Sequence, residues 1–402
     1  MSITDEALPA TLGLAYLARI ASDPAGLPKV WEALVERATS NPEDSGAWLD
    51  LSTLLQLTGN REKGLEVQAA ALSGQRCFRK VHGRGGGLRI LAFMTPGDMM
   101  ANTPLDFLLE GSDCELTLCY LDGEPPPYAD LPEHDLAFLA VGQSEESGPL
   151  LGLLKGALDA WPRPVVNGRP EAIAALTRDR VAARFSGHPR ILSPPTFRTS
   201  RAALTAMILD GTGGLDFPLI VRPIGSHAGH GLERVTGAGA LGAYLALHPA
   251  AEFYVAPFID YAGGDGLYRK LRVVFVRGRP FLAHMAVSAN WMVHYLNADM
   301  DKHPSRREEE AAVMASFDEG FAARHAGAFA ALTEAFGLDY FGIDCAEAPD
   351  GRLLVFEADV AMIVHDMDPP DLYPYKGPAM RRLFDGFLQG LDELRPAARS
   401  AA

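Results

Sequence analysis

The spacing of apolar residues divides the chain into three kinds of segment. From Leu8 to Leu72 apolar residues recur at helical intervals and β-branched clusters are rare, which predicts a small helical region. From Leu88 to about residue 195, short apolar runs typical of strands alternate with helical runs, which predicts an open α/β layer. From Phe217 onward paired strand-like runs dominate, and they predict antiparallel hairpins.

Within the first region the sequence predicts one helical hairpin. The segment 41–44 begins a helix that carries Trp48, Leu51 and Leu54 on one face, and 57–60 supplies the turn before a second helix. This pattern resembles one tetratricopeptide-type unit, although that repeat family usually stacks about three units to bury a core. A plain helical cap is the alternative interpretation. We place the end of this region near residue 80.

Later elements follow from the same patterns. A helix is expected at 238–247, and a longer one from Ser305 to Phe336 with Gly337 at its C-cap. The glycines at 83–87 precede the first strand of the α/β layer, whereas a dinucleotide fingerprint needs them after it, so a Rossmann oxidoreductase is disfavoured. The predicted strands are 88–93, 116–121, 136–141, 164–167, 219–223, 253–259, 271–276, 281–287, 341–346 and 353–358.

Composition narrows the classes of partner. The 402 residues include 36 Lys and Arg against 51 Asp and Glu, a formal charge of −15, so nucleic acid and membrane surfaces are not expected partners. The four cysteines form no CxxC pair, so neither a disulfide framework nor a zinc site is expected. The N-terminal residues carry no basic, apolar export signal, and we expect a cytoplasmic protein.

Carboxylates concentrate on one predicted hairpin. Asp350-Gly351 between two apolar runs indicates a tight turn, and a two-residue loop there would place Asp344 directly opposite Glu357. Asp359 lies two residues beyond Glu357 and so shares its face of the sheet. Like charges at this spacing repel each other, and a divalent cation would explain them. Oxygen ligands without His or Cys favour Mg²⁺ or Mn²⁺ with substrate phosphates, which indicates a nucleotide.

Two other arrangements would remove the need for a metal. Glu357 and Asp359 could end a strand in water while Asp344 pairs with an arginine. A register shift of one residue would place Asp344 and Glu357 on opposite faces.

A second motif combines a cation with a glycine-rich loop. An apolar strand ends at Arg222, and Gly225, Gly229 and Gly231 follow. Glycine lets successive backbone N–H groups approach phosphate oxygens closely. By itself such a loop is also compatible with a plain mobile hairpin, and its histidines, His227 and His230, are more often packed loop residues than metal ligands.

Together the two motifs resemble the ATP-grasp superfamily of carboxylate–amine ligases, of the glutathione-synthetase kind. The resemblance covers about residues 88–390 and includes the strand 253–259 and the segment Lys270–Val276. It implies an α/β domain before an ATP-grasp fold of two α+β subdomains, behind the helical N-terminal domain. The implied domains are 1–80 (helical, tetratricopeptide-like), 81–195 (α/β), 196–262 (small subdomain) and 263–402 (large subdomain with the metal site).

The resemblance also implies roles for individual residues. Asp344, Glu357 and Asp359 look like metal ligands, and Arg272 looks like a catalytic cation facing the transferred phosphate. Arg222 looks like a second catalytic cation. The implied nucleotide-binding residues are Arg222, Gly225, Ser226, His227, Gly229, Gly231, Tyr254, Val255, Pro257 and Phe258.

This chain departs from the family pattern at several positions. The family commonly has Lys at Arg222, an acid at Lys270 and Asn at Asp359, and many members carry an arginine within the strand that aligns with 284–288, where this chain has none. The implied activity is ATP- and Mg²⁺-dependent joining of a small-molecule or peptide carboxylate to an amine or other nucleophile, through an acyl phosphate. A peptide or protein is a further expected partner of the helical region. The alternatives are a nucleotide-binding adaptor without turnover and a helical-repeat scaffold.

Three further segments are predicted to border the substrate. They are 97–104 after the first α/β strand, 288–297 with Trp291, and 364–370 with His365 and Asp368. A packed loop or a proline-terminated connector explains the last two equally well.

Overall fold

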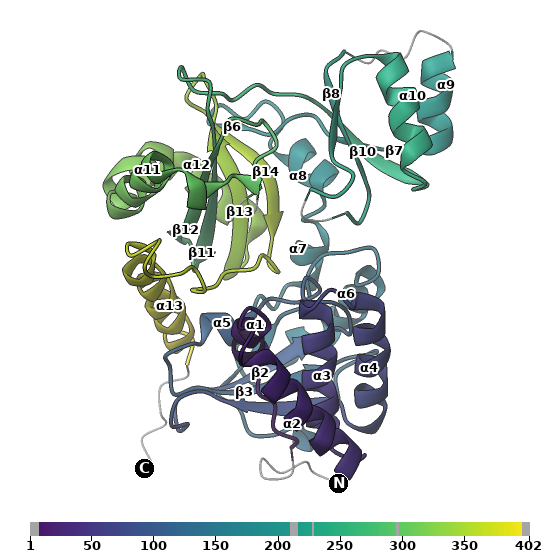
Figure 1. Ribbon diagram of the computed structural model, residues 1–402, viewed down its shortest axis with the longest axis vertical. Coiled ribbons are helices and arrows are strands. Elements are labelled where there is room, and N and C mark those ends of the chain that lie inside the picture. Colours follow the sequence, from purple (N-terminus) through teal and green to yellow (C-terminus); the bar gives the residue numbers. More distant parts are fainter. Residues whose placement is uncertain (1–7, 210–215, 227–228, 295–296, 396–402) are drawn as a thin grey trace.

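The computed structural model describes residues 8–209, 216–226, 229–294 and 297–395 (Figure 1). Three sheets and their covering helices make up the fold, and they confirm the expected mixture of an α/β layer and α+β units behind N-terminal helices. The described residues include no helix that is both long and apolar enough to cross a bilayer.

The N-terminal helices form a layer against the first sheet. Asp44 caps the third helix by accepting a hydrogen bond from the backbone N–H of Ala47 at 2.9 Å, where the sequence predicted a helix start. Leu49 and Leu72 share a buried cluster with Phe78 of the first sheet, so the helices and the sheet have a common core. The helices are α1 (Leu14–Ala21), α2 (Leu27–Ser40), α3 (Ser45–Leu57) and α4 (Arg61–Gly74).

The first sheet has five strands in the order β1-β3-β2-β4-β5. Strands β2, β3, β4 and β5 are parallel, as expected for an open α/β layer, and β1 is antiparallel to β3. The sheet begins at Cys77, so β1 spans the position near residue 80 where the sequence predicts a boundary. Its strands are β1 (Cys77–Val81), β2 (Arg89–Met94), β3 (Glu115–Tyr120), β4 (Leu136–Leu139) and β5 (Val165–Val166). The accompanying helices are α5 (Leu105–Leu108), η2 (Tyr128–Asp130), α6 (Gly148–Asp159), α7 (Pro170–Ala174) and α8 (Arg178–Arg184).

A second, smaller sheet lies at one end of the molecule (Figure 1). Its order is β7-β10-β8-β9, and all its pairs are antiparallel. Two helices pack on it through a small core that includes Leu204, Leu241 and Phe253. The elements are β7 (Phe197–Ser200), α9 (Arg201–Leu209), β8 (Leu219–Pro223), β9 (Glu233–Val235), α10 (Ala238–Leu247) and β10 (Glu252–Pro257).

The third sheet has the order β12-β11-β13-β14-β6. Its long strands are antiparallel, and only the short β6 runs parallel to its neighbour. The strands are β6 (Ile191–Leu192), β11 (Tyr268–Val276), β12 (Arg279–Ser288), β13 (Tyr340–Glu347) and β14 (Leu353–Asp359). The helices are η4 (Met300–Lys302), α11 (Pro304–Ala315), η5 (Asp318–Ala322), α12 (Ala323–Phe336) and α13 (Lys376–Asp392).

The expected long helix over 305–336 is two helices. A π-helical turn, η5, separates α11 from α12. At Ser316 the side chain donates a hydrogen bond to the carbonyl of Ala312, which provides the end of α11 with a local partner. Gly337 follows α12 with a φ of 59°, the left-handed C-cap that the sequence predicts.

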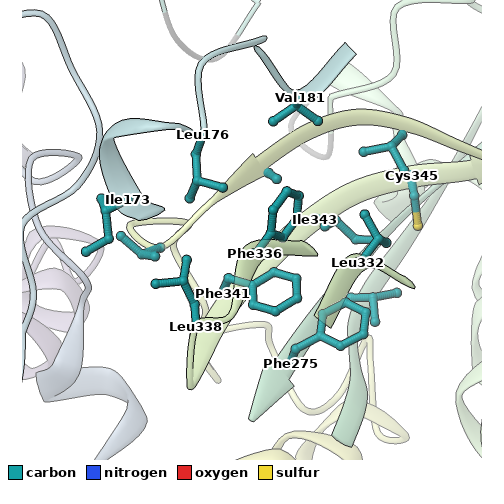
Figure 2. Close-up of a cluster of buried hydrophobic side chains, with 14 of the residues drawn as sticks. Ile173, Leu176, Val181, Phe275, Leu332, Phe336, Leu338, Phe341, Ile343 and Cys345 are labelled. Atoms are coloured by element: carbon teal, nitrogen blue, oxygen red, sulfur yellow. The ribbon is translucent and has the colours of Figure 1, made fainter. Parts of the chain in front are cut away.

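Aromatic rings fill the core under the third sheet (Figure 2). Phe275 and Phe341 from neighbouring strands stack with centroids 4.5 Å apart, and Phe336 of α12 meets Phe341 edge-on at 5.2 Å. Each such buried side chain stabilises the fold by about 1.5–3 kcal/mol relative to an exposed one. Ile173 and Val181, from α7 and α8, pack into the same cluster, so the segment between the first and second sheets is anchored on the third.

Two side-chain contacts tie the first sheet to the third. Thr103 donates a hydrogen bond to the carbonyl of Val360 at 2.9 Å, just beyond β14. Asn167 donates to the Tyr340 carbonyl at 2.8 Å and accepts from the Tyr340 N–H at 2.9 Å. These buried hydrogen bonds hold the end of the first sheet against β13 and β14.

Candidate active site

A cavity of about 500 Å³ lies between the second and third sheets. Strands β8 and β10 line it on one side, and β11, β12 and β14 line it on the other. Met100, from the loop after β2, also reaches it, so the predicted substrate segment 97–104 contributes one wall residue. This volume suits a ligand of nucleotide size.

One end of the cavity is apolar. Tyr254, Pro257 and Phe258, to which the resemblance assigned nucleotide binding, line it together with Ala256 and Ile220. Val255, which the resemblance also assigned to nucleotide binding, is fully buried in the core of the second sheet because side chains alternate along β10.

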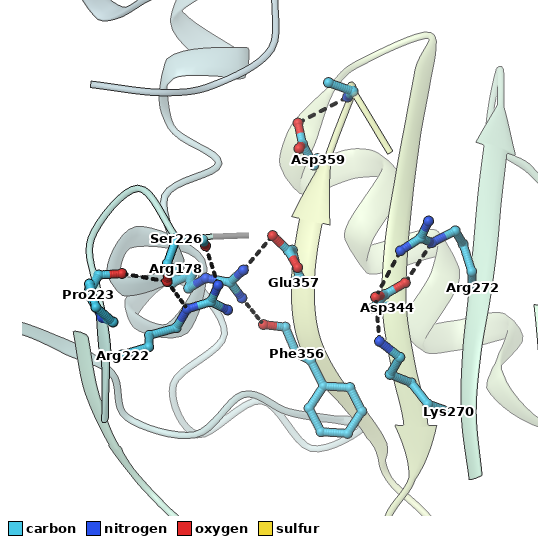
Figure 3. Close-up of polar contacts among 11 residues, drawn as sticks. Arg178, Arg222, Pro223, Ser226, Lys270, Arg272, Asp344, Phe356, Glu357 and Asp359 are labelled. Atoms are coloured by element: carbon cyan, nitrogen blue, oxygen red, sulfur yellow. Dashed lines mark hydrogen bonds and ion pairs between the residues drawn. The ribbon is translucent and has the colours of Figure 1, made fainter. Parts of the chain in front are cut away.

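Arg222 ends β8 beside the glycine-rich loop. Its Nε donates a hydrogen bond to the Ser226 hydroxyl at 3.2 Å, the guanidinium also donates to the Ser226 carbonyl, and that hydroxyl donates to the Pro223 carbonyl at 2.8 Å (Figure 3). Burial, reinforced by Arg178 nearby, lowers the pKa of Arg222 to about 10. Thus a buried cation faces the cavity, and among the described residues its hydrogen bonds go to neutral acceptors.

The glycine loop reaches the cavity at one of its predicted positions. Gly229 lines the cavity, whereas Gly225, Ser226 and Gly231 do not. His227 lies outside the described residues.

Arg178, which the sequence did not single out, is central to the polar end. It is the first residue of α8, it forms an ion pair with Glu357, and it donates to the carbonyl of Phe356 at 3.0 Å (Figure 3). No motif marks it, because it comes from a short helix distant from both motifs in the sequence. Only the packing of α8 on β14 brings it here.

The β13–β14 hairpin pairs Asp344 with Glu357, as predicted, but its turn and its ladder differ from the predicted ones. Asp344 lies opposite Glu357, as expected, but Cys345 lies opposite Val355, so Phe356 is an extra residue that forms a bulge. The Ala348 N–H donates a hydrogen bond to the Arg352 carbonyl at 2.9 Å, and Gly351 has a φ of 80°. The turn therefore has three residues, 349–351, rather than the expected two. The longer turn and the bulge compensate each other, and the bulge leaves the Phe356 carbonyl available to Arg178.

Asp344 is held by two cations. Its carboxylate accepts hydrogen bonds from Lys270 at 2.9 Å and from Arg272 Nε at 2.8 Å (Figure 3). Burial alone would raise the pKa of Asp344, but Arg272 and Lys270 outweigh it and hold the pKa well below its ordinary value. Two cations for one carboxylate leave net positive charge at this position of the cavity.

The other two predicted ligands differ sharply from each other. Burial would raise the pKa of Glu357, but Arg178 and Arg222 lower it to about 2, so this carboxylate is ionised. Asp359 accepts a hydrogen bond from the Ala361 N–H at 3.0 Å. Burial, with the negative charge of Glu357 adding to it, raises the pKa of Asp359 to about 7. Among the described residues no cationic side chain forms an ion pair with Asp359.

The donor chemistry fits a hard cation at part of this hairpin. Glu357 and Asp359 line the same cavity with oxygen donors, and a cation would relieve the uncompensated charge of Asp359. Asp344 lines the cavity too, but its ion pairs with Lys270 and Arg272 occupy it. In the part of the chain that the structure describes, no group of three His, Cys, Asp or Glu side chains is assembled as a metal site.

Three histidines and one more acid line the rest of the cavity wall. His284, His294 and His365 line it with Asp368, so the segment 364–370 contributes to the wall. Trp291 of the segment 288–297 also lines the cavity and lies against Phe258 of the apolar end, with ring centroids 5.6 Å apart. Burial lowers the pKa of each of the three histidines.

A buried lysine lies behind Asp368. Lys376 lies 2.9 Å from the Asp368 carboxylate and 3.3 Å from that of the fully buried Glu310. No motif in the sequence marks the pair of Lys376 and Glu310, because these residues lie on α13 and α11 at ordinary helical positions.

No protein-family model and no curated protein sequence matches the chain. Solved structures that resemble it include a RimK domain protein ATP-grasp from Sphaerobacter thermophilus, at 18% identity over 75% of this chain and 99% of that one, with a TM-score of 0.42. The D-alanine–D-alanine ligase from Bacillus anthracis is 14% identical over 77% of this chain and 99% of its own, with a TM-score of 0.43. The D-cycloserine synthetase DcsG is 16% identical over 76% and 99%, with a TM-score of 0.42.

Proposed function

We propose that this chain is a magnesium-dependent ligase of the ATP-grasp type. It would activate a carboxylate with ATP as an acyl phosphate and join it to an amine or another nucleophile. The observation that carries this proposal is a cavity lined both by an apolar wall of β10 and by the cations Arg222, Arg178, Lys270 and Arg272. Such an arrangement suits a ligand that is a flat apolar base at one end and a polyanion at the other.

The charges of the site support phosphoryl transfer to a carboxylate. A carboxylate attacking the γ-phosphate brings two anions together, so the transition state needs positive charge from the protein. Arg222 would contact the phosphates from β8, and the excess positive charge of Lys270 and Arg272 over Asp344 would face the attacking acid. These side chains bind and orient both anions.

Glu357 and Asp359 would hold the magnesium ion. When bound, the ion would polarise phosphate oxygens as a Lewis acid. Met100, Trp291 and Met292 would cover the cavity against water, which protects an acyl phosphate from hydrolysis. His294 and Asp368 border the end where the accepting nucleophile would enter.

The test is mass-spectrometric detection of ADP together with a condensed product, with ATP, Mg²⁺ and pooled carboxylic acids and amines. Glu357→Gln and Asp359→Ala should each lower turnover by about 100-fold or more while the fold remains intact by circular dichroism. Asp350→Asn is the matched control, because Asp350 lies at the exposed tip of the same hairpin and pairs with Arg352. Unchanged turnover in both site variants would contradict the assignment.

A nucleotide-binding protein without turnover is the second candidate. The observation that favours it is His284, which lies on β12 opposite Arg272. Burial lowers the pKa of His284, so β12 adds no permanent cation to the cavity where phosphoryl transfer would need positive charge. Calorimetry separates the candidates: saturable ATP binding without ADP release supports the adaptor, and absence of binding contradicts both. Absence of binding would leave the helical-repeat scaffold.

A further inference from the structure

Two cysteine thiols meet in the first sheet, far from the cavity. Cys77 of β1 and Cys119 of β3 are direct partners in the antiparallel register, and their sulfur atoms are 3.0 Å apart. Both are free thiols, and 42 positions of sequence separate them. The sequence offered no sign of this pair, because the antiparallel pairing of β1 and β3 creates it.

The ladder shows which kind of cross-strand pair they form. The Tyr120 N–H donates to the Arg76 carbonyl, and the His82 N–H donates to the Cys114 carbonyl, both at 2.9 Å. Hydrogen-bonded and non-hydrogen-bonded pairs alternate along an antiparallel ladder. Cys77 and Cys119 therefore form a non-hydrogen-bonded pair, in which Cα atoms are typically about 4.5 Å apart. That spacing lies within the range of about 4.4–6.8 Å that disulfides span.

The surroundings distinguish these thiols from the other two. Cys77 is 3% exposed and Cys119 is 1% exposed. The contact with Cys119 lowers the pKa of Cys77, which increases its thiolate character. The same contact, together with burial, raises the pKa of Cys119, and burial raises the pKa of Cys114 and Cys345. The sulfur–sulfur contact is what distinguishes the pair, because no such contact to Cys114 or Cys345 occurs among the described residues.

We propose that Cys77 and Cys119 are a reversible redox pair that hydrogen peroxide converts to a disulfide. The Cys77 thiolate attacks one peroxide oxygen and breaks the O–O bond, which gives a sulfenic acid and hydroxide. The Cys119 sulfur then attacks the sulfenic sulfur, forming the S–S bond and releasing the sulfenic oxygen as water. Overall, two thiols lose two electrons and two protons, and one peroxide is reduced to two waters.

The bond would form where the helical region joins the sheet. Cys77 begins β1 only three positions after the end of α4. A covalent link to β3 restricts the unfolded chain between the two residues, so the oxidised protein should resist local unfolding better than the reduced one. Because this region lies outside the cavity, the inference is independent of the ligase proposal.

The experiment uses the full chain with Cys114→Ser and Cys345→Ser, so that only the two paired thiols remain. After brief treatment with hydrogen peroxide, we expect an intact mass lower by two hydrogen atoms, full recovery with dithiothreitol, and a non-reduced peptide pair that contains both residues. The thermal midpoint of the oxidised protein should rise by a few degrees. Cys119→Ser in the same background is the control and should give no loss of two hydrogens.

Two results would overturn the proposal. One is oxygen addition that dithiothreitol does not reverse; the other is retention of both thiols as alkylatable groups after unfolding. Because the serine variants could fold poorly, the same peptide mapping is performed on the unaltered protein. There, a bond that joins Cys77 to Cys114 or Cys345 instead of Cys119 would also contradict the proposal.

Discussion

Two of the regions that contain largely buried carboxylates differ in the partners of those carboxylates. At the start of α1, Asp50 accepts hydrogen bonds from the Leu12 N–H at 2.8 Å and the Gly13 N–H at 3.5 Å, and Asp106 accepts from the Ala15 N–H at 2.6 Å. At the cavity, Asp344 and Glu357 are instead balanced by arginine and lysine side chains. The first region uses backbone donors, whereas the second uses side-chain cations for Asp344 and Glu357 and a backbone donor for Asp359 alone.

The difference indicates what each region can do. Backbone N–H groups at a helix start are fixed in place, so the carboxylates there fasten α1 to α3 and α5 and have little freedom to exchange partners. Side-chain cations around a 500 Å³ cavity can turn from a carboxylate to a phosphate without disturbing the backbone. Removal of a partner should therefore impair stability in the first region and ligand binding in the second.

Among the changes that compare these two regions, Arg178→Ala should have the largest effect. It removes one cation of the cavity and leaves Glu357 without its ion-pair partner, so we expect ATP affinity to fall by at least about tenfold, or about 1.4 kcal/mol. Isothermal titration calorimetry measures the change. Arg180→Ala is the control, because Arg180 lies on the same helix and its side chain reaches the Ala174 carbonyl rather than the cavity. Equal affinities in Arg178→Ala and the unaltered protein would show that Arg178 is structural.

Asp50→Ala should lower the stability of the fold and leave ATP affinity nearly unchanged. The change leaves the Leu12 and Gly13 N–H groups without their acceptor, and an unsatisfied buried donor costs about 1–3 kcal/mol. Denaturant unfolding should detect this loss, while ATP affinity stays within twofold of the unaltered value. A large loss of ATP affinity in a folded variant would remove the distinction between the two regions.

The pH dependence of the free energy of unfolding tests the role of Asp50 in the first region. Burial outweighs the backbone donors and raises the pKa of Asp50 from 3.8 to about 7. Between these values the folded state binds more protons than the unfolded state, so this group lowers stability as pH rises from about 4 to about 7. Asp50→Asn should reduce that decline, measured as the free energy of unfolding at several pH values. A decline of the same size in the variant would assign it to other groups.

Gln68→Ala should have the smallest effect. Gln68 of α4 donates to the Gly97 carbonyl and accepts from the Gly97 N–H, both at 2.8 Å, and this holds the loop that carries Met100 to the cavity. We expect the KM of the accepting substrate to rise a few-fold while the KM of ATP stays constant.

Lys63→Ala, at an exposed position of the same helix, is the control for that measurement. Equal changes in both KM values, or none, would show that the N-terminal helices do not position this loop.

Local sequence patterns predicted most of the secondary structure and part of the site. The strand at 219–223 and the helix at 238–247 have the predicted bounds, because apolar periodicity and glycine or proline at their ends define them locally. The pairing of Asp344 with Glu357 was also predicted, although a bulge and a longer turn, neither with a clear local signal, together produce it.

Contacts between distant segments could not be predicted in this way. Arg178 reaches Glu357 because α8 packs on β14, and Lys376 reaches Glu310 because α13 lies beside α11. The interruption at η5 was missed because alanine-rich sequence favours helix on both sides of it. The metal ligands, the nucleotide-binding residues and the domain boundaries stay predictions.

The bulge at Phe356 could be lost without changing which residues face each other at the site. Deleting Phe356 would make Glu357 follow Val355 directly, so Glu357 would still lie opposite Asp344 in a regular ladder. The same deletion would eliminate the carbonyl that Arg178 contacts at 3.0 Å. A straightened β14 therefore keeps the facing pair of carboxylates, and the arginine on α8 then keeps just one of its two anchors.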